Sequence, residues 1–305
     1  MENKGNILTL GTFDGVHRGH QALLNSVTTF AKELHLKSLA LTFTKPPRLY
    51  FSPSKEPTLL TTIQEKRRFL NSIGIDRVRV LNFNQSLASV SATDFFNRII
   101  LRQCGAKGIV VGYNFCFGSS REGTIPFLKK MAKRKGIRVE VLPPLLKGER
   151  PISSGWIRES LKRGHLKLAN DLLGRAYSAE GTVVPGLGIG KKIGFPTLNF
   201  KVDPMKILPE GVFVVKVNLK DENKFWIGMA NVGVRPTIVE ELKNKRLEVH
   251  LLNFRGNLYG ETLTAHFLKK IRSEKKFDSL GSLKAQLKKD LEVTKHSLFF
   301  RLTRE

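Results

Sequence analysis

The order of hydrophobic patterns along the chain is the feature that most limits its fold. Up to about residue 145, short apolar runs alternate with segments whose apolar residues recur at helical spacing. The apolar runs are residues 6–10, 37–43, 77–83, 108–111 and 138–142, and the helical segments are 17–34, 64–73, 92–103 and 124–135. Such alternation is typical of a parallel sheet covered by helices on both faces, with ligands bound beyond the carboxyl ends of its strands.

The pattern changes after residue 175. Two short helices are expected over residues 152–163 and 167–173, and β-type runs broken by Gly, Pro and Asn follow at 179–184, 212–219, 225–232, 246–253 and 262–271. This spacing is typical of an antiparallel barrel or sandwich. A final helix carries the stripe Leu280, Leu283, Leu287, Leu291 and Leu298. The sequence therefore predicts an α/β domain over residues 1–174 and an all-β domain with a C-terminal helix over residues 175–305.

The composition is that of a water-soluble globular protein. Of the 305 residues 41% are hydrophobic, which is enough to build a core. We find neither a secretory pattern at the start nor a run of about 18 apolar residues, and Cys104 and Cys116 have no metal or disulfide spacing. We expect a cytoplasmic protein without a membrane partner, and a homo-oligomer is possible.

The net charge indicates anionic partners. The chain has 52 Lys and Arg against 26 Asp and Glu, which gives a formal charge of +26. Such an excess suits nucleic acid, anionic lipid or phosphorylated small molecules, although charges scattered over solvated faces would give the same total. Basic clusters such as Lys133-Arg134-Lys135 have no interleaved aromatic residues, so we expect small phosphorylated substrates and not nucleic acid.

A glycine- and histidine-rich motif follows the first predicted strand and opens the first predicted helix. It reads Gly11-Thr12-Phe13-Asp14-Gly15-Val16-His17-Arg18-Gly19-His20. A helix start offers free N–H groups to phosphate, and Gly15 and Gly19 allow close approach. His17 and His20 can point the same way, and no Walker Lys-Ser/Thr follows. The pattern fits enzymes that attack the α-phosphate of a nucleotide and expel pyrophosphate by positioning and charge stabilisation; ordinary turn histidines are the alternative.

A second motif lies in the predicted β domain. It reads Gly186-Leu187-Gly188-Ile189-Gly190-Lys191-Lys192-Ile193-Gly194-Phe195-Pro196-Thr197-Leu198-Asn199. Its glycines make a loop whose amides can surround phosphates, and Lys191 and Lys192 add charge. Thr197 and Asn199 share one face of a strand and offer hard oxygen ligands for Mg²⁺. A flexible hairpin is the alternative.

The first motif resembles the signature of the bacterial bifunctional riboflavin kinase/FAD synthetases, within the nucleotidyltransferase superfamily with its H-x-G-H arrangement. Three further stretches match in order: Leu59-Leu60-Thr61-Thr62 with Glu65-Lys66, then Gly112-Tyr113-Asn114-Phe115-Cys116-Phe117-Gly118, then Ile152-Ser153-Ser154-Gly155-Trp156-Ile157-Arg158. The resemblance implies a Rossmann-like domain that binds ATP and FMN, with His17 and His20 on the ATP phosphates. Its other site residues would be Gly11, Phe13, Asp14, Gly19, Asn114, Ser153, Ser154 and Arg158.

The ending Gly194-Phe195-Pro196-Thr197-Leu198-Asn199 resembles that of riboflavin kinases. Matching stretches follow in order: Pro209-Glu210-Gly211-Val212-Phe213, Asn231-Val232-Gly233-Val234-Arg235-Pro236-Thr237, Glu248-Val249-His250-Leu251-Leu252-Asn253-Phe254, Leu258-Tyr259-Gly260 and Ile271-Arg272-Ser273-Glu274-Lys275-Lys276-Phe277. The resemblance implies that Glu248 is the base that takes the proton of riboflavin's terminal ribityl hydroxyl as it attacks the γ-phosphate. It implies ATP binding by Gly190, Lys191, Gly194, Pro196, Thr197 and Asn199, Mg²⁺ at Thr197 and Asn199, and flavin contacts at Arg272 and Glu274.

Two kinds of alternative stay open at this point. Glu248 and His250 could be a solvent-facing polar pair, and Arg272 and Glu274 an exposed ion pair.

The chain also departs from the family pattern at Pro46, where a histidine is usual, and at Gly155 and Trp156, where a hydroxyl residue and an arginine are usual. Each lost hydrogen bond to phosphate is worth about 1–3 kcal/mol. A monofunctional riboflavin kinase with a degenerate first domain is therefore the second hypothesis, and a nucleic-acid-binding protein on the same scaffold is the third.

Overall fold

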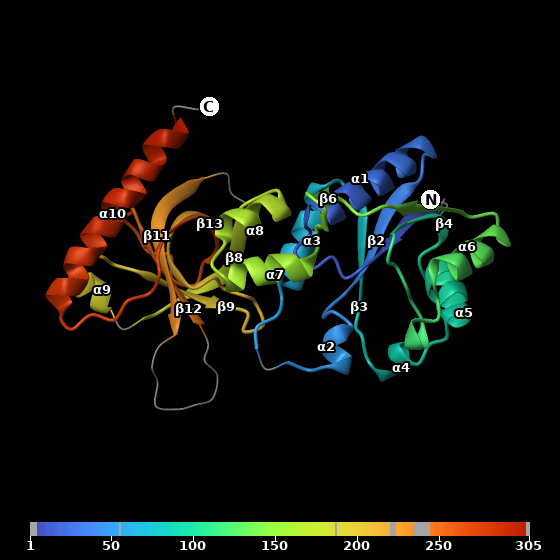
Figure 1. Ribbon diagram of the computed structural model, residues 1–305, viewed down its shortest axis with the longest axis horizontal. Coiled ribbons are helices and arrows are strands. Elements are labelled where there is room, and N and C mark those ends of the chain that lie inside the picture. The colour runs from blue at the N-terminus through green and yellow to red at the C-terminus, as the bar shows by residue number, and fades with distance from the viewer. Residues whose placement is uncertain (1–4, 55, 187, 220–223, 235–244, 303–305) are drawn as a thin grey trace. The chain divides into compact units, whose positions relative to one another are not determined.

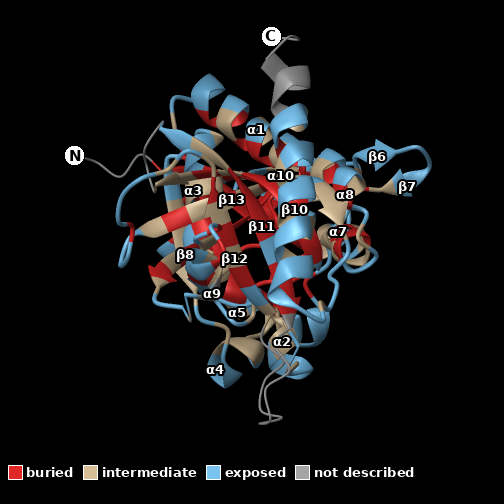
Figure 2. Ribbon diagram, turned by 90° about the vertical axis from the view of Figure 1, so that its left-hand side faces the viewer, coloured by how far each residue is buried: buried red, intermediate tan, exposed pale blue. Residues whose placement is uncertain are grey.

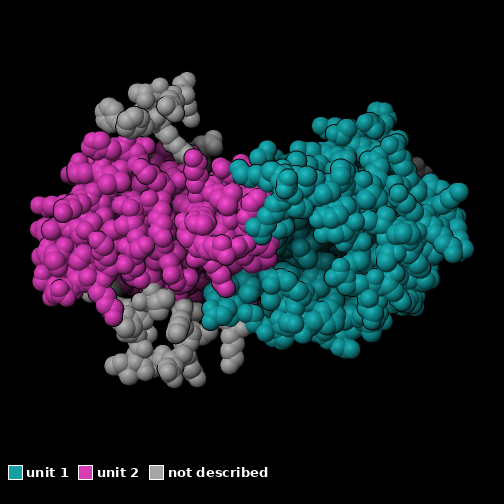
Figure 3. Space-filling view, viewed as in Figure 1, with its two compact units in different colours: residues 1–154 teal, residues 155–305 magenta. Residues whose placement is uncertain are grey.

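The computed structural model describes residues 5–54, 56–186, 188–219, 224–234 and 245–302. The chain divides into two compact units, residues 1–154 and 155–305 (Figure 3). Helices α7 (Ser154–Lys162) and α8 (Leu166–Leu173) precede the first barrel strand. Asn170 of α8 donates to the Phe267 carbonyl and accepts from the Tyr177 amide, at 3.0 and 2.7 Å, so α8 is bound to the barrel. The functional boundary at residues 174/175 stays a prediction.

The first unit is built on a parallel sheet with strand order β3-β2-β1-β4-β5, as the alternating pattern predicts (Figure 1). The strands are β1 (Asn6–Leu10), β2 (Lys37–Phe43), β3 (Arg77–Leu81), β4 (Ala106–Gly112) and β5 (Arg138–Leu142). All of β1 is buried, and its neighbouring residues Ile7 and Leu8 belong to two different hydrophobic clusters. Both faces of the sheet are therefore covered, which is why its strands read as continuous apolar runs.

Capping residues set where the principal helices begin. Helix α1 (Arg18–Glu33) starts at His17, whose side chain accepts from the His20 amide. Helix α3 (Ile63–Ser72) starts with a capping box formed by Thr62 and Glu65. The other helices are α2 (Arg48–Phe51), α4 (Gln85–Ala88), α6 (Ile125–Lys133) and the short η2 (Ser119–Arg121), and β6 (Leu146–Lys147) pairs with β7 (Arg150–Pro151).

One predicted helix differs in type. The segment 92–103 is a short α-helix, α5 (Ala92–Asp94), which continues as a π-helix, η1 (Phe95–Gln103). Phe95, Phe96, Ile99 and Ile100 are buried along it. Apolar spacing does not distinguish the two helix types because both place residues three to five apart on one side.

The second unit is a closed barrel with strand order β10-β11-β12-β9-β8-β13, so the barrel and not the sandwich is the observed form. Its strands are β8 (Tyr177–Val184), β9 (Leu198–Val202), β10 (Gly211–Leu219), β11 (Phe225–Val234), β12 (Lys245–Leu251) and β13 (Thr262–Arg272), and α9 (Ile189–Lys192) lies between β8 and β9. Along β12, Leu247, Val249 and Leu251 are buried while Glu248 and His250 are half-buried. This alternation places Glu248 and His250 on the outer surface of the barrel.

Helix α10 (Leu280–Leu302) lies against the outside of the barrel (Figures 1 and 2). Leu283, Leu287 and Leu291 of the predicted stripe pack against Ile193, Phe195 and Met229. Leu280 is 57% exposed, so its assignment to the packed stripe is wrong, and the side chain of Leu298 lies outside the described residues. In the part of the chain described, no helix has both the length and the apolar run needed to cross a bilayer.

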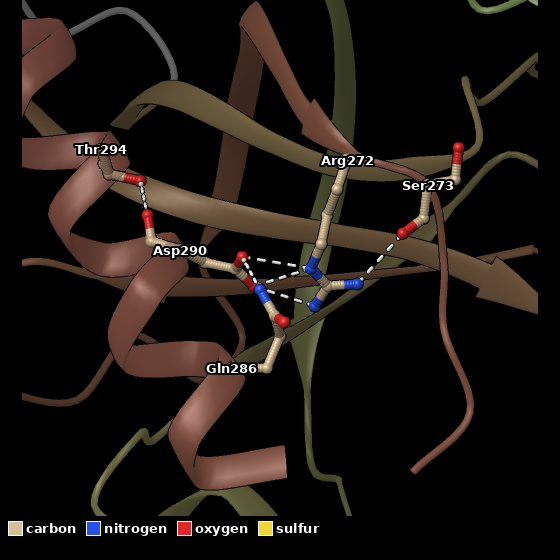
Figure 4. Close-up of polar contacts among 5 residues, drawn as sticks. All are labelled: Arg272, Ser273, Gln286, Asp290 and Thr294. Atoms are coloured by element: carbon tan, nitrogen blue, oxygen red, sulfur yellow. Dashed lines mark hydrogen bonds and ion pairs between the residues drawn. The ribbon is translucent and has the colours of Figure 1, made fainter. Parts of the chain in front are cut away.

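A buried ion pair fixes α10 to the end of β13 (Figure 4). Nε and Nη2 of Arg272 donate to the Asp290 carboxylate at 2.8–3.1 Å, and the two side chains are 14% and 2% exposed. Gln286 Nε2 donates to the same carboxylate at 2.9 Å, and Thr294 Oγ1 donates to the Asp290 carbonyl at 2.9 Å. The geometry is bidentate and every partner is satisfied, the condition under which a buried ion pair holds well.

The substitution Asp290→Asn is expected to loosen α10. It leaves the Arg272 guanidinium largely buried without its counter-charge, a change that costs about 3–5 kcal/mol in comparable buried pairs. Because the two units need not unfold together, the measurement is amide hydrogen exchange of α10 and β13, which should become faster than in wild type. Glu292→Gln, at an exposed position on the same helix, is the matched control, and equal protection in both variants would contradict the anchoring role.

Candidate active sites

The first site is built on the loop between β1 and α1. Gly11 prolongs the sheet, since its amide donates to the Leu41 carbonyl at 3.1 Å. Phe13 and Val16 follow with φ values of 47° and 40°, which side-chain-bearing residues and above all β-branched ones rarely adopt. Both are buried, at 1% and 0% exposure. The loop therefore depends on contacts outside itself to keep this backbone conformation.

Asp14 supplies the central contact of this loop. Its buried carboxylate accepts hydrogen bonds from the Leu60 amide, the Thr61 amide and Thr61 Oγ1 at 2.9, 3.1 and 3.3 Å. Thr61 Oγ1 in turn accepts from the Gly15 amide at 3.0 Å. The stretch 59–62, which the sequence identifies only as a matching segment, is thus the surface to which the loop is bound.

The structure brings the two predicted histidines together. The rings of His17 and His20 are stacked with centroids 3.6 Å apart, and His17 Nδ1 accepts from the His20 amide at 3.3 Å. The edge of the Phe13 ring packs on His20 with centroids 5.3 Å apart. A side chain at Gly19 would place its Cβ 3.3 Å from the His17 ring. The spacing correctly predicts the shared side, and phosphate binding by the pair stays a prediction.

The remaining residues predicted for the first site are only partly gathered around this loop. Ser154 Oγ donates to the Asp14 carbonyl at 2.7 Å, and Ser153 beside it is exposed. Asn114 is exposed just beyond the carboxyl end of β4, the strand that neighbours β1. Arg158 lies half-buried on α7, in the second compact unit. Adjacent parallel strands end at one edge, so Asn114 shares its edge with the histidine loop.

Of the three departures from the family pattern, Pro46 lies in the first unit, and Gly155 and Trp156 lie at the start of the second. Pro46 is buried before α2, and its carbonyl accepts from the Leu49 amide at 2.9 Å. Gly155 is exposed and Trp156 half-buried at the start of α7. Neither Pro46 nor Gly155 has a side-chain donor for phosphate, so the backbone and the other side chains must supply those contacts.

An aromatic cluster at the ends of β2 and β3 is a feature that sequence reasoning missed. We use this name for Phe43, Tyr50, Phe51 and Phe83, whose adjoining ring centroids are 5.3–5.8 Å apart. Tyr50 and Phe51 are 38% and 67% exposed. The cluster lies at the edge of the sheet where ligands bind. Phe83 joins it from the segment that follows β3, so only the strand order reveals the set.

The second site is a row of polar side chains across three neighbouring strands of the barrel. In the strand register Glu248 of β12 is opposite Asn199 of β9 on one side and Asn231 of β11 on the other. Side chains directly opposite each other have Cβ atoms about 4.5–5.5 Å apart. Glu248 and Asn199 are half-buried and Asn231 is exposed. In the sequence, Asn231 belongs to a matching stretch but has no assigned role. Only the strand register shows that it lies opposite Glu248.

Close backbone contacts shape the loop that precedes β9. The Phe195 amide donates to the Gly190 carbonyl at 2.8 Å, and a Cβ at position 190 would overlap the Phe195 carbonyl. A Cβ at Gly186 would likewise overlap the Asn199 amide. His250 Nδ1 lies 2.8 Å from the Pro196 carbonyl. These contacts hold Asn199 in the row and Thr197 next to it in the chain, and they give His250 a partner within the loop.

The other predicted kinase residues fall around this loop or outside the described chain. Lys191 and Lys192 are exposed on α9, and Gly194 follows with a φ of 86°. Leu187, Arg235, Pro236 and Thr237 lie outside the described residues.

Arg272 and Glu274 do not form the exposed ion pair that is the alternative to flavin binding. The Arg272 guanidinium binds Asp290, while the Glu274 carboxylate lies against Gly233 of β11, where a Cβ would overlap it. Gly233 is two residues from Asn231, so Glu274 lies near the polar row.

Comparison with known proteins finds matches for both parts of the chain. A family model described as FAD synthetase matches residues 1–155, and one described as riboflavin kinase matches residues 173–298. Proteins named bifunctional riboflavin kinase/FMN adenylyltransferase are 38% identical in Haemophilus influenzae, over 96% of this chain and 94% of the relative, and 37% identical in Escherichia coli strain K12, over 99% and 95%. This chain belongs to that family.

The similarity to known proteins covers both compact units, in sequence and in fold. A crystal structure from Streptococcus pneumoniae, described as a macrolide-efflux protein, superposes with a TM-score of 0.84 at 32% identity, over 97% of this chain and 95% of that one. Both domains of a bifunctional riboflavin kinase/FMN adenylyltransferase are present. The bifunctional hypothesis therefore stands above the monofunctional one.

The polar row suits the metal that these enzymes use with ATP. Thr197 and Asn199 offer a hydroxyl and an amide oxygen, both hard oxygen donors. Mg²⁺ keeps several waters and nucleotide oxygens among its six ligands, so two or three protein oxygens are enough. The residues present fit the ion.

The substitution Gly190→Ala is expected to impair the kinase site alone. The added Cβ would overlap the Phe195 carbonyl, so the loop before Thr197 must move. Misplacement of about 1 Å costs about 10²-fold in rate. FMN formation from riboflavin should fall by that factor, while FAD formation from supplied FMN should stay within about twofold. Gly281→Ala, where the Cβ would make an ordinary contact at 3.7 Å, is the control; unimpaired FMN formation in Gly190→Ala would contradict the loop's role.

Proposed function

We propose that this chain makes FMN and FAD in two successive reactions at two separate sites. At the polar row of the barrel, riboflavin and MgATP give FMN and ADP. At the loop between β1 and α1, FMN and MgATP give FAD and pyrophosphate. The observation that carries the first assignment is the row Asn199–Glu248–Asn231, which sets a carboxylate between two amides on one face. The stacked histidines over a helix start carry the second.

The kinase reaction uses Glu248 as base. Its carboxylate takes the proton of the terminal ribityl hydroxyl while that oxygen attacks the γ-phosphorus, and the bond to the bridging oxygen of ADP breaks. Thr197 and Asn199 hold Mg²⁺ with the phosphates, and Lys191 adds positive charge at the loop. Mg²⁺ supplies charge neutralisation on the phosphates when bound. Catalysis consists mainly of positioning.

The adenylyl transfer needs no protein nucleophile. A phosphate oxygen of FMN attacks the α-phosphorus of ATP, and pyrophosphate leaves with the electron pair of the broken bond. His17, His20 and the N–H groups of the first turn of α1 stabilise the developing charge. Ser153, Ser154, Asn114 and Arg158 are proposed as further ATP and FMN contacts. The exposed rings of the aromatic cluster offer the isoalloxazine ring an apolar stacking surface.

The proposed setting is the cytoplasm, and the proposed partners are the small molecules riboflavin, FMN and ATP. The positive net charge favours the anionic ones among them, FMN and ATP, by steering. Binding to DNA or RNA would depend steeply on salt. Retardation of oligonucleotides at physiological salt would favour the nucleic-acid hypothesis instead.

The decisive assay is a chromatographic time course of riboflavin with MgATP and purified protein. FMN followed by FAD is the expected order. Accumulation of FMN alone would support the monofunctional kinase, in which Pro46 and Gly155 have removed the second activity. Absence of both products would refute both site assignments.

Glu248→Gln is expected to lower FMN formation by about 10²–10⁴-fold, the usual contribution of a general base. ATP binding to the barrel and FAD formation from supplied FMN should be retained, since the amide has the same shape and the first site is untouched. Initial rates of the two half-reactions, with either riboflavin or FMN as substrate, provide the measurement. Turnover of riboflavin at the wild-type rate would rule out Glu248 as the base.

His20→Asn is expected to have the reverse effect. Loss of the imidazole removes a hydrogen bond to the developing phosphate charge, which costs about 10²-fold or more in related sites. FAD formation should fall while FMN formation from riboflavin continues. The same two assays measure it, and a parallel loss of both activities would instead indicate general misfolding.

A further inference from the structure

Lys66 of α3 is a buried lysine to which the proposed reactions assign no task. It is 2% exposed, and lysine is almost never fully buried unless it is paired. Its Nζ donates to the Phe43 carbonyl at 3.1 Å and to Thr42 Oγ1 at 3.4 Å. Thr42 and Phe43 are the last two residues of β2. The ammonium therefore lies at the ligand-binding edge of the sheet.

A chain of hydrogen bonds continues from Lys66 into the histidine loop. Thr42 Oγ1, which accepts from Lys66, itself donates to the Thr12 carbonyl at 3.2 Å. Thr12 immediately precedes Phe13, the first residue with positive φ. The ammonium thus orients the hydroxyl that holds Thr12, at the point where the loop leaves regular strand geometry.

Asp14 provides the counter-charge on the other side. Burial lowers the pKa of Lys66 from 10.5 to about 8, and the Asp14 carboxylate opposes this change. On α3 itself, the Glu65 carboxylate is engaged in the capping box, since its Oε2 accepts from the Thr62 amide at 2.8 Å. The end of β2 presents only the neutral Thr42 and Phe43. At neutral pH the ammonium is consequently charged, and it loses its proton in a range where ordinary lysines keep theirs.

As pH rises, deprotonation of Lys66 is expected to change folding stability and FAD formation in opposite directions. A lysine whose folded pKa lies below the unfolded value favours the folded state more as pH rises, so folding gains stability between about pH 8 and 10.5. In the folded chain the positive charge beneath the loop is lost around pH 8, at the lower end of this interval. A decline in activity above pH 8 therefore cannot come from unfolding at this site.

We propose that Lys66 is a positioning residue for adenylyl transfer, which acts through Thr42 and Thr12 to hold the loop between β1 and α1 in its phosphate-binding conformation. This inference rests on the function proposed for that loop. It predicts that Lys66 affects FAD formation and leaves riboflavin phosphorylation in the same chain unchanged.

The first test compares Lys66→Met with Lys37→Met. Lys37 lies at the opposite end of β2 from the residues that Lys66 contacts, and it is 61% exposed and bound to Asp76, so the control removes a lysine charge away from the site. FAD formation from FMN should fall by about 10²-fold in Lys66→Met, the scale of a 1 Å misplacement, and stay within about twofold in Lys37→Met. FMN formation from riboflavin should be equal in both. FAD formation at the control rate in Lys66→Met would overturn the proposal.

Two further readouts distinguish positioning from a merely structural role. Wild-type FAD formation should decline above pH 8 while FMN formation does not share that decline, and Lys66→Met should lack this part of the profile. Thr42→Val removes the linking hydroxyl with little change of volume, and the double variant Thr42→Val/Lys66→Met should be no slower than Lys66→Met alone. Additive losses, or a wild-type profile retained in Lys66→Met, would overturn the proposal. A wild-type protein that makes FMN but no FAD would overturn the function proposed for the loop as well.

Discussion

The Asp14 carboxylate accepts three hydrogen bonds from Leu60 and Thr61 where water does not reach, and the geometry of the first site follows from that contact. The strained backbone at Phe13 and Val16 costs on the order of 1–3 kcal/mol for each residue. Hydrogen bonds to a charged group contribute about 1.5–3 kcal/mol each. The polar contacts and the burial of both side chains therefore outweigh the strain, and they hold the loop in one conformation.

The second site lies on the outer surface of the barrel, where its polar side chains must also be held in place. Its interior is filled by apolar residues such as Leu247, Val249 and Phe267, so a polar site has to use the outward positions of the same strands. Glu248 gains order from the strands on either side, and Asn199 from the close approach of Gly186. The contact between His250 and the Pro196 carbonyl joins the phosphate loop to the strand that carries Glu248. A strand thus positions Glu248, and a loop with closely packed glycines positions Thr197 and Asn199.

Local sequence patterns were enough to predict most helices and strands and the two glycine-rich motifs at residues 11–20 and 186–199. The runs 37–43 and 138–142 match β2 and β5 at both ends, because a buried parallel strand is a continuous apolar run between polar turns. What escaped prediction depends on contacts distant in sequence. The aromatic cluster needs the order of β2 and β3, the role of Asn231 needs the barrel register, and the partner of Arg272 is on α10, 18 residues away. The π-helix escaped because its apolar spacing resembles that of an α-helix.

Arg272 shows why the role of a charged residue beside a proposed ligand site is ambiguous from sequence. A guanidinium near a flavin and one that anchors a helix require the same residue type, and only the position of a carboxylate separates them. Here the Asp290 carboxylate accepts hydrogen bonds from both Nε and Nη2 of Arg272. Glu274, two residues further along, is the side chain of this stretch that reaches β11, close to Asn231. The anchored helix fixes where the chain after Arg272 goes, and it therefore helps to place Glu274 beside the polar row.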